Sequence, residues 1–422
     1  MAGASELGFG RNLTPRKIAS TVVAALVLAA AFVLVLQVSI AGAFRSDSPA
    51  LALDWAPRDA TARARLAASL VGPGASPEGR SAARRLALDS VRRDPLMPMA
   101  LRALGLATAP RGGTESAAAT QAMLQAERLS RRDQPVQLWL AEYSLERGDI
   151  GEMMRHFDIA MRTSTTSREA VFPLLAAAAS NRDFAQALAA AMDKRPPWGL
   201  GLTAYMIDEG PDPDLTVRLA QEFLDPKVPE ELAMVRSLMA RLGQLEEYDL
   251  AQAVRSSFGL DQARGSSPTG VREGGFETAS GFEPFAWSLT QDDDLWAARE
   301  SDPAGNGTVL RLSAGDGFSG EVARQLLDLS PGRYRLRARF GDVPDDRDAW
   351  PKIEVRCATA SESALLALTP SRAGVAAHSA VGAFQVPGAC RFQWLSLSVT
   401  APNEEIADPP WVDDLAVIPA GA

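Results

Sequence analysis

This 422-residue sequence is poor in histidine, the side chain that most often acts as a general acid or base in catalysis. It holds only two histidines, His156 and His378, and neither has a neighbour at a spacing typical of metal ligands. The nucleophile-elbow pattern G-x-S-x-G, the Walker A loop and the zinc motif H-E-x-x-H do not occur. A glycoside hydrolase needs only two carboxylates, so that reaction stays open, although no acidic pair is distinguished. We therefore expect a protein that binds rather than one that catalyses.

Tryptophan side chains provide one kind of binding chemistry, since a flat ring can stack on the face of a sugar. Five of the eight tryptophans lie in the last third of the chain: Trp287, Trp296, Trp350, Trp394 and Trp411. Trp287 and Trp394 alternate with polar neighbours, so we expect them between packed sheets. Trp296 and Trp350 lie in polar, acidic stretches and are the candidate glycan-binding platforms. The alternative is that all five belong to a core.

A second kind of binding chemistry comes from arginines that alternate along the segment GRYRLRARF. The arginines are Arg333, Arg335, Arg337 and Arg339. In an extended strand they share one face and the apolar residues share the other. Such a stripe could bind an anionic polymer. The alternative is a solvated face neutralised by carboxylates such as Glu354 on a neighbouring strand.

Overall composition narrows the classes of partner. A net charge of −9 and a pI near 5.1 argue against a protein that neutralises nucleic-acid phosphates. Hydrophobic content of 46% and charged content of 23% are typical of folded chains. The length allows two or three domains, each with its own core.

The only cysteines, Cys357 and Cys390, lie in the strand-like runs KIEVRC and CRFQWLSLSV. In a sandwich they could face each other, and a bond would close a loop of about 34 residues and contribute roughly 4 kcal/mol on the chain-entropy model. The alternative is a pair of buried thiols. An oxidising compartment favours the disulfide.

An uncharged segment between Lys17 and Arg45 points to such a compartment. Residues 22–36 are apolar without a break. As a helix, the uncharged segment would reach about 40 Å, more than the ~30 Å hydrocarbon core of a bilayer requires. We therefore predict a transmembrane anchor at residues 18–44.

The charges around this segment set its orientation. Arg11, Arg16 and Lys17 precede it and only Arg45 follows closely. The positive-inside rule then places residues 1–17 in the cytoplasm and the remainder in the periplasm, with the anchor in a bacterial inner membrane. The alternative is a cleaved signal peptide with Ala41-Gly42-Ala43 as its recognition site.

Residues 50–260 have the periodicity of amphipathic helices. A clear example is Ile150, Met153, Met154, Phe157, Ala160 and Met161, which recur at i, i+3, i+4, i+7, i+10 and i+11. Turn sequences such as Gly148-Asp149 and Gly210-Pro211 recur along the segment. The pattern predicts about ten to twelve short helices arranged as antiparallel hairpins.

Two of these segments resemble tetratricopeptide repeats. In ALDSVRRDPLMPMALRALGLA, a turn at Asp94-Pro95 precedes the first-helix residues Leu101, Leu104 and Gly105. In QLWLAEYSLERGDIGEMMRHFDIAMR, Leu140 and Ala141 match the first helix, Gly148 the turn within the repeat, and Phe157 and Ala160 the second helix. The resemblance implies stacked helical hairpins whose concave surface binds protein partners.

After a polar stretch at residues 261–273, which we predict to be a linker, the periodicity changes to two. The segments TVLRL, GRYRLRARF, KIEVRC, GAFQV, CRFQWLSLSV and WVDDLAVI alternate or are continuously apolar. With other candidates they give eight or nine strands in about 150 residues, which predicts an all-β sandwich or jelly roll over residues 274–422.

Three motifs follow one another in this region: GGFE followed by a W-x-L strand, then SPGRYRLRARF, then WVDDLAV. In that order they resemble the carbohydrate-binding-module jelly rolls of galactose-binding type. The resemblance implies glycan binding and a structural calcium ion held by Glu277 and Asp413. The alternative is that the aspartate caps a strand end.

These observations predict a non-catalytic, membrane-anchored periplasmic scaffold with no cofactor beyond a possible calcium ion. Its helical repeats would bind an envelope protein and its sandwich a glycan, in a system that makes or exports bacterial surface polysaccharide. One alternative is an assembly factor of the cell envelope that binds only protein. Another is a hydrolase with an unrecognised acidic pair.

Overall fold

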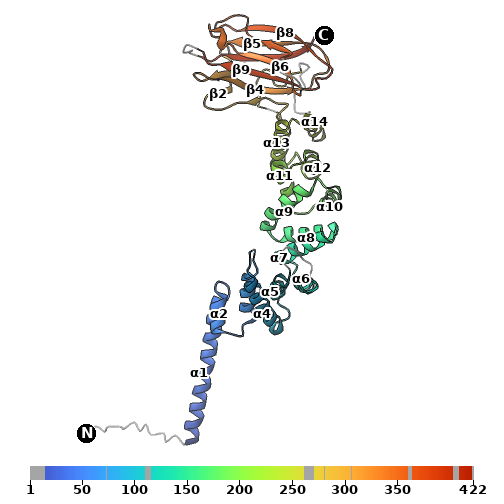
Figure 1. Cartoon of the computed structure of the whole chain (residues 1–422). Helices are drawn as coiled ribbons and strands as arrows, with labels where there is room; N and C mark the ends of the chain where they lie inside the picture. Colours follow the sequence, from blue (N-terminus) through green and yellow to red (C-terminus); the bar gives the residue numbers. More distant parts are fainter. Residues whose placement is uncertain are drawn as a thin grey trace, which may run out of the picture. The chain divides into compact units, whose positions relative to one another are not determined.

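The computed structural model describes residues 15–72, 74–109, 116–260, 270–279, 281–305, 307–359, 364–402 and 408–420. These residues form an N-terminal apolar helix, a region of thirteen further helices and a two-sheet antiparallel β-sandwich (Figure 1), which confirms the predicted fold class. Most of the predicted cytoplasmic segment and of the predicted linker lies outside the described residues. The chain divides into two compact units, Met1–Trp198 and Gly199–Ala422.

Helix α1 (Pro15–Phe44) contains the apolar segment predicted to span a membrane. Its stretch Val22–Phe44 reaches a mean hydropathy of 2.7, and the rest of the described chain buries none of the most apolar part. A helix of this length and composition can cross a bilayer, and a signal sequence has the same properties.

The other helices of the first unit are short and punctuated by polar caps. They are α2 (Pro49–Trp55), α3 (Ala60–Ser69), α4 (Pro77–Arg93), α5 (Pro98–Thr108), α6 (Ala117–Leu129), α7 (Gln134–Glu146), α8 (Ile150–Thr163), α9 (Thr165–Ala178) and α10 (Arg182–Met192). Side-chain oxygens such as those of Asp59, Ser76 and Asp133 accept hydrogen bonds from amides in the first turn of the helix that follows. These caps satisfy amides that have no partner inside the helix.

Small residues allow these helices to approach one another closely, as expected of stacked hairpins. A Cβ atom on Gly105 of α5 would lie 3.0 Å from the side chain of Met123 on α6. Gly148 has a φ of +73° in the turn between α7 and α8, and Leu140 and Ala141 are buried. The structure confirms the packing roles of these residues, while the assignment to the tetratricopeptide family stays a prediction.

The second unit begins with four helices, α11 (Gly199–Glu209), α12 (Pro213–Phe223), α13 (Pro229–Gln244) and α14 (Tyr248–Ser257). Their apolar faces form one core with residues of the sandwich: Val235, Leu238 and Tyr248 from the helices pack in the same cluster as Leu326 and Phe392. The last four helices and the sandwich are therefore one folded body, and the division between compact units falls inside the predicted helical-repeat domain.

Ten strands form the sandwich among the described residues. They are β1 (Ser288–Leu289), β2 (Leu295–Ser301), β3 (Thr308–Ala314), β4 (Ser319–Leu327), β5 (Gly332–Gly341), β6 (Lys352–Cys357), β7 (Leu366–Leu368), β8 (His378–Val386), β9 (Gln393–Thr400) and β10 (Trp411–Pro419), with a 3₁₀ helix η2 (Arg347–Ala349) before β6. One sheet has the order β1-β4-β9-β6-β7 and the other β2-β3-β10-β5-β8. Figure 1 shows β5 and β8 in one layer and β9, β6 and β4 in the other.

The apolar sides of the two sheets face each other and form the core, in which Leu312, Leu336, Phe340, Ile353 and Leu397 are fully buried. Alternation of these residues with polar ones is what the period-two segments predict. The outer face of the sheet that contains β5 carries the arginine stripe.

The opening stretch GGFE runs beside β10 at a bulge between Asp413 and Ala416. The carbonyl oxygen of Gly274 accepts a hydrogen bond from the amide of Leu415 at 2.9 Å. A Cβ atom on Gly274 would lie 2.0 Å from the carbonyl oxygen of Leu415, so only glycine fits. Phe276 then enters the core, where its ring lies 5.3 Å from that of Trp287.

A disulfide joins Cys357 at the end of β6 to Cys390 in the connection between β8 and β9, with 5.4 Å between the Cα atoms. The predicted pairing is confirmed. Strands β8 and β9 belong to different sheets, so Cys390 lies in a connection that crosses from one sheet to the other. The disulfide attaches this connection to β6, which is in the same sheet as β9.

Candidate functional site

Strand β5 presents its arginines outward, as the alternation predicts. Leu336, Ala338 and Phe340 are buried in the core, whereas Arg333, Arg335 and Arg337 are exposed. β5 lies between β10 and β8, so it is not an edge strand and its outer face is fixed by hydrogen bonds on both sides. The stripe is therefore part of a rigid surface.

The first three arginines of the stripe have apolar or neutral cross-strand neighbours. Arg337 lies opposite Val381 of β8 and Ala416 of β10. Arg335 lies opposite Ala383 and Ile418, and Arg333 lies opposite Gln385. For none of the three does the structure show an ion pair within the described residues. In a chain with a net charge of −9, this patch is cationic and open.

The predicted alternative, neutralisation by Glu354, does not occur. Glu354 is on β6 in the other sheet, where its carboxylate pairs with Lys352 at 2.6 Å. The arginine stripe and this carboxylate therefore lie on opposite outer faces of the sandwich.

Arg339, the fourth arginine, has a different environment. Its guanidinium pairs with Asp302 at 2.9 Å and Asp413 at 2.5 Å, and it lies 5.0 Å from the ring of Trp411. The pKa of Asp302 is lowered, first by the hydrogen bond from the amide of Ala304 and then by Arg339. Burial raises the pKa of Asp413, and the bond from Arg339 only partly offsets this. Arg339 is thus engaged in an internal charge network.

A second engaged arginine continues this network towards the edge of the sheet. Arg311 of β3 pairs with Glu300 at 2.8 Å and Asp342 at 3.1 Å, and donates to the carbonyl oxygen of Pro409 at 2.6 Å. The outer face of this sheet is therefore divided into a half where charges are compensated and the half that carries Arg333, Arg335 and Arg337. We call these three residues the open arginine patch.

The two predicted platform tryptophans differ in position. Trp296 is half-buried on the outer face of β2, opposite Ser313 of β3. Trp350 packs against the sandwich core, and its Nε1 donates to the carbonyl oxygen of Pro344 at 2.8 Å. Trp350 is thus held by the fold, and Trp296 is the better placed of the two to meet a ligand.

The structure separates the two tryptophans that we expected between the sheets. Trp287 is in the core, as predicted. Trp394 points away from the sheets, and its ring meets Tyr248 of α14 edge-on with 5.9 Å between centroids. The alternating pattern placed Trp394 between the sheets, but it lies on the outer face of β9, where helix α14 covers it.

A hollow of about 800 Å³ opens at one end of the sandwich. It is lined by loops after β3, β5 and β9 and includes Ser313, Asp316, Phe318, Thr400 and Pro410. Phe318 is 45% exposed. An exposed ring among hydroxyl groups and a carboxylate is a combination suited to sugars, and the size is typical of small-molecule sites.

The residues predicted to hold calcium lie near the bulge of β10. Glu277 accepts a hydrogen bond from the amide of Thr308 at 3.1 Å. Asp413 Oδ1 is buried without a hydrogen-bond partner, and a Cβ atom on Gly275 would be 3.8 Å from it. The described residues contain no cluster of three or more metal-ligating side chains. The orphaned oxygen fits a cation, and calcium held by Glu277 and Asp413 stays a prediction.

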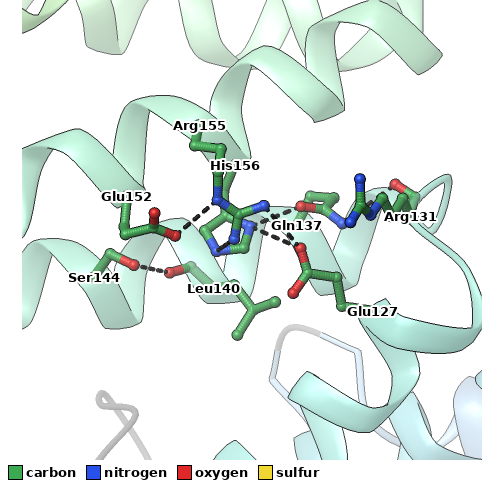
Figure 2. Close-up of polar contacts among 8 residues, drawn as sticks. All are labelled: Glu127, Arg131, Gln137, Leu140, Ser144, Glu152, Arg155 and His156. Carbon is green, nitrogen blue, oxygen red and sulfur yellow. Dashed lines mark hydrogen bonds and ion pairs between the residues drawn. The ribbon is translucent and has the colours of Figure 1, made fainter.

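His156 belongs to a buried polar cluster of α6, α7 and α8, shown in Figure 2. Its Nδ1 lies 2.7 Å from Oε1 of Gln137 and its Nε2 lies 2.9 Å from Nη2 of Arg155, with Glu127 3.7 Å away. Burial, followed by the charge of Arg155, lowers the pKa of His156. The imidazole is 3% exposed, so the cluster ties helices together rather than meeting a substrate.

No family model matches the chain, and no curated protein matches it. Among solved structures, the sandwich is distantly similar to the enzymatically active domain of bacteriophage CBA120 tailspike protein 4, with 14% identity and a TM-score of 0.28 over 36% of this chain and 22% of that one. It is also distantly similar to a CBM4 module, with 14% identity and a TM-score of 0.27 over 35% of this chain and 99% of that one. At TM-scores this low, neither likeness decides what the chain binds.

Proposed function

We propose that this chain is a non-catalytic, membrane-anchored periplasmic protein of a bacterial inner membrane whose sandwich binds an acidic polysaccharide along the open arginine patch. The observation that carries the proposal is the absence of acidic cross-strand neighbours around Arg333, Arg335 and Arg337. Alternate residues of a strand lie about 6.7 Å apart, so the three guanidinium groups form a row that a linear polyanion can follow. Apolar side chains such as Val381 and Ile418 lie beside the row and suit the apolar faces of sugar rings.

The region around the possible cleavage site supports a retained anchor. Ala41-Gly42-Ala43 lies within α1, which continues to Phe44. Ala41 is buried against Ala52 and Ala62 of the next two helices. This packing is in keeping with a helix that stays attached to the rest of the chain. The disulfide between Cys357 and Cys390 is in keeping with an extracytoplasmic sandwich.

The proposal is tested with the second compact unit, residues 199–422, because a fragment that begins at the sandwich would expose the core shared with α13 and α14. Its retention on a uronic-acid polymer and on a neutral glucan should differ, with only the acidic polymer bound. Replacing Arg335 and Arg337 by glutamine should weaken binding about fivefold, since exposed ion pairs contribute roughly 0.5 kcal/mol each.

The control changes net charge equally, using Arg218→Gln and Arg372→Gln, which are exposed in other parts of the second unit. This variant should bind as the parent does. If both double variants weakened binding equally, binding would depend only on net charge, and the open arginine patch would be refuted as the binding site. Release of reducing ends from the polymer would contradict the non-catalytic assignment.

The helical region of the first unit is proposed to bind a protein of the cell envelope, as a repeat stack would. A hollow of about 680 Å³ between α6 and α7 includes Thr120, Leu124, Arg128, Tyr143 and Arg147. Leu124 is 39% exposed and Arg147 lies over the ring of Tyr143. If residues 199–422 bind no glycan while residues 50–198 capture one defined envelope protein, the alternative of a purely protein-binding assembly factor is favoured.

A further inference from the structure

A groove runs along the outer end of helix α1. One wall is a single face of α1 formed by Leu34, Gln37, Val38 and Ala41, which recur at i, i+3, i+4 and i+7, and Arg45 continues it one residue beyond the end of the helix. The other wall is the connection from α2 to α3, residues 55–59, which crosses this face. The groove has a volume of about 490 Å³.

The groove matches one leaflet of a bilayer in length. From Leu34 to its last residue, Phe44, the helix advances ten residues, or about 15 Å at 1.5 Å each, and half of a ~30 Å hydrocarbon core is ~15 Å. In the orientation proposed above, Leu34 lies near the middle of the membrane and Arg45 at its outer surface. The apolar wall is therefore continuous with the hydrocarbon of the outer leaflet.

The mouth of the groove carries groups that favour a phospholipid headgroup. Trp55 is 42% exposed there, and tryptophan is enriched at the level of headgroups. Arg45 is held by Asp59, whose Oδ2 accepts from Nε at 2.9 Å and from Nη2 at 2.6 Å. Arg58 is exposed, and no ion pair to it is recorded in the described part of the chain.

Both carboxylate oxygens of Asp59 accept hydrogen bonds that hold this arrangement. Its Oδ1 also accepts from the amide of Ala62, the capping bond of α3, and these bonds lower its pKa against the effect of burial. The carboxylate therefore fixes Arg45 at the mouth while Arg58 remains available, so an anion arriving there meets two guanidinium groups.

We propose that this groove binds one phospholipid of the surrounding bilayer, with an acyl chain along the exposed Leu34 and Val38 and the phosphate at Arg58 and Arg45. The inference rests on the proposed membrane anchoring and adds a specific lipid site to it. A headgroup phosphate supplies the anion and the chain supplies the apolar length, so a single amphipathic molecule satisfies both parts of the groove.

The site is tested by native mass spectrometry of the full chain, purified in a nonionic detergent and titrated with dioleoyl phosphatidylglycerol. One bound lipid is expected. Arg58→Ala should weaken binding about tenfold, as loss of a charge-assisted hydrogen bond does. Val38→Trp should abolish binding because the larger ring fills the groove.

Two controls keep the test specific. Val33→Trp places the same side chain on another face of α1, and Arg92→Ala removes an exposed arginine of α4; both should bind lipid as the parent does. Absence of a bound lipid in the parent, or unchanged binding by Val38→Trp, overturns the proposal. Extraction of membranes with alkaline carbonate distinguishes failure of the membrane anchor from failure of the lipid site. Release of the chain from the membranes refutes the anchor. Retention of the chain without a bound lipid refutes only the groove.

Discussion

At the scale of single residues, Arg339 is distinguished from its neighbours on β5 by what surrounds it. Asp302 and Asp413 are 4% and 5% exposed, and Arg339 is the cation that faces both. Arg339→Met leaves two buried carboxylates without compensation, and we expect a loss of about 3 kcal/mol in the free energy of unfolding near neutral pH. Urea unfolding of residues 199–422 measures it, with Arg337→Met as the exposed control that should change stability by less than about 0.5 kcal/mol.

The pH dependence of this variant is a separate check. In the parent, the lowered pKa of Asp302 contributes stability that is present above its unfolded value and lost as the pH falls through its folded pKa. The raised pKa of Asp413 acts in the opposite sense, favouring the folded state only at low pH. Without Arg339 both pKa values should rise, so the deficit of Arg339→Met should shrink on acidification. A deficit that is constant down to about pH 4 would contradict this account.

Asp413 also carries the calcium prediction. If its unpartnered Oδ1 is a ligand, calcium should raise the melting temperature of residues 199–422, because a ligand that binds only the folded state stabilises it. Asp413→Asn should remove the increment, and Asp293→Asn, in an exposed loop, should keep it. Equal melting temperatures in calcium and in chelator would refute the prediction.

The sequence predicts residues of this site unevenly. The alternation of Arg333, Arg335, Arg337 and Arg339 predicts a shared face correctly. It does not separate Arg339 from the others, because the carboxylate of Asp302 comes from the connection between β2 and β3 and only strand register brings it there. Arg311 stands in the strand-like segment TVLRL, but nothing local to it predicts its ion pairs with Glu300 and Asp342.

At the scale of elements, the helices before the sandwich act as part of it. Tyr248 of α14 is 3% exposed and contacts Phe392 and Trp394. Tyr248→Ala should therefore lower the free energy of unfolding by about 3 kcal/mol. In residues 199–422 it should lower the melting temperatures of the helices and of the sandwich together. Leu245→Ala, at an exposed position, is the control. Helical signal that melts earlier while tryptophan fluorescence is unchanged would show that the two parts are independent.

The apolar pattern of α13 predicts this buried face but not its partner. Val235, Leu238, Met239 and Leu242 recur at helical spacing and are buried as expected. Periodicity says that a face is covered, and any apolar surface of suitable shape can cover it. Strand β4, in contrast, could not be recognised from its own pattern. It has a bulge between Glu321 and Ala323, and its Leu326 faces the helices instead of the other sheet. Both features interrupt the alternation, so the strand gives no clear period-two signal.

At the scale of the whole molecule, the anchor and the disulfide make one joint prediction about location. A phosphatase that is active only after export, fused after Ala422, should be active, and Cys357 and Cys390 should resist maleimide until a reductant is added. Replacing both cysteines by serine should then lower stability by roughly 4 kcal/mol, since the closed loop has a sequence separation of 33. A silent phosphatase together with freely reactive thiols would place the sandwich in the cytosol, where neither an extracellular glycan nor a stable disulfide is expected.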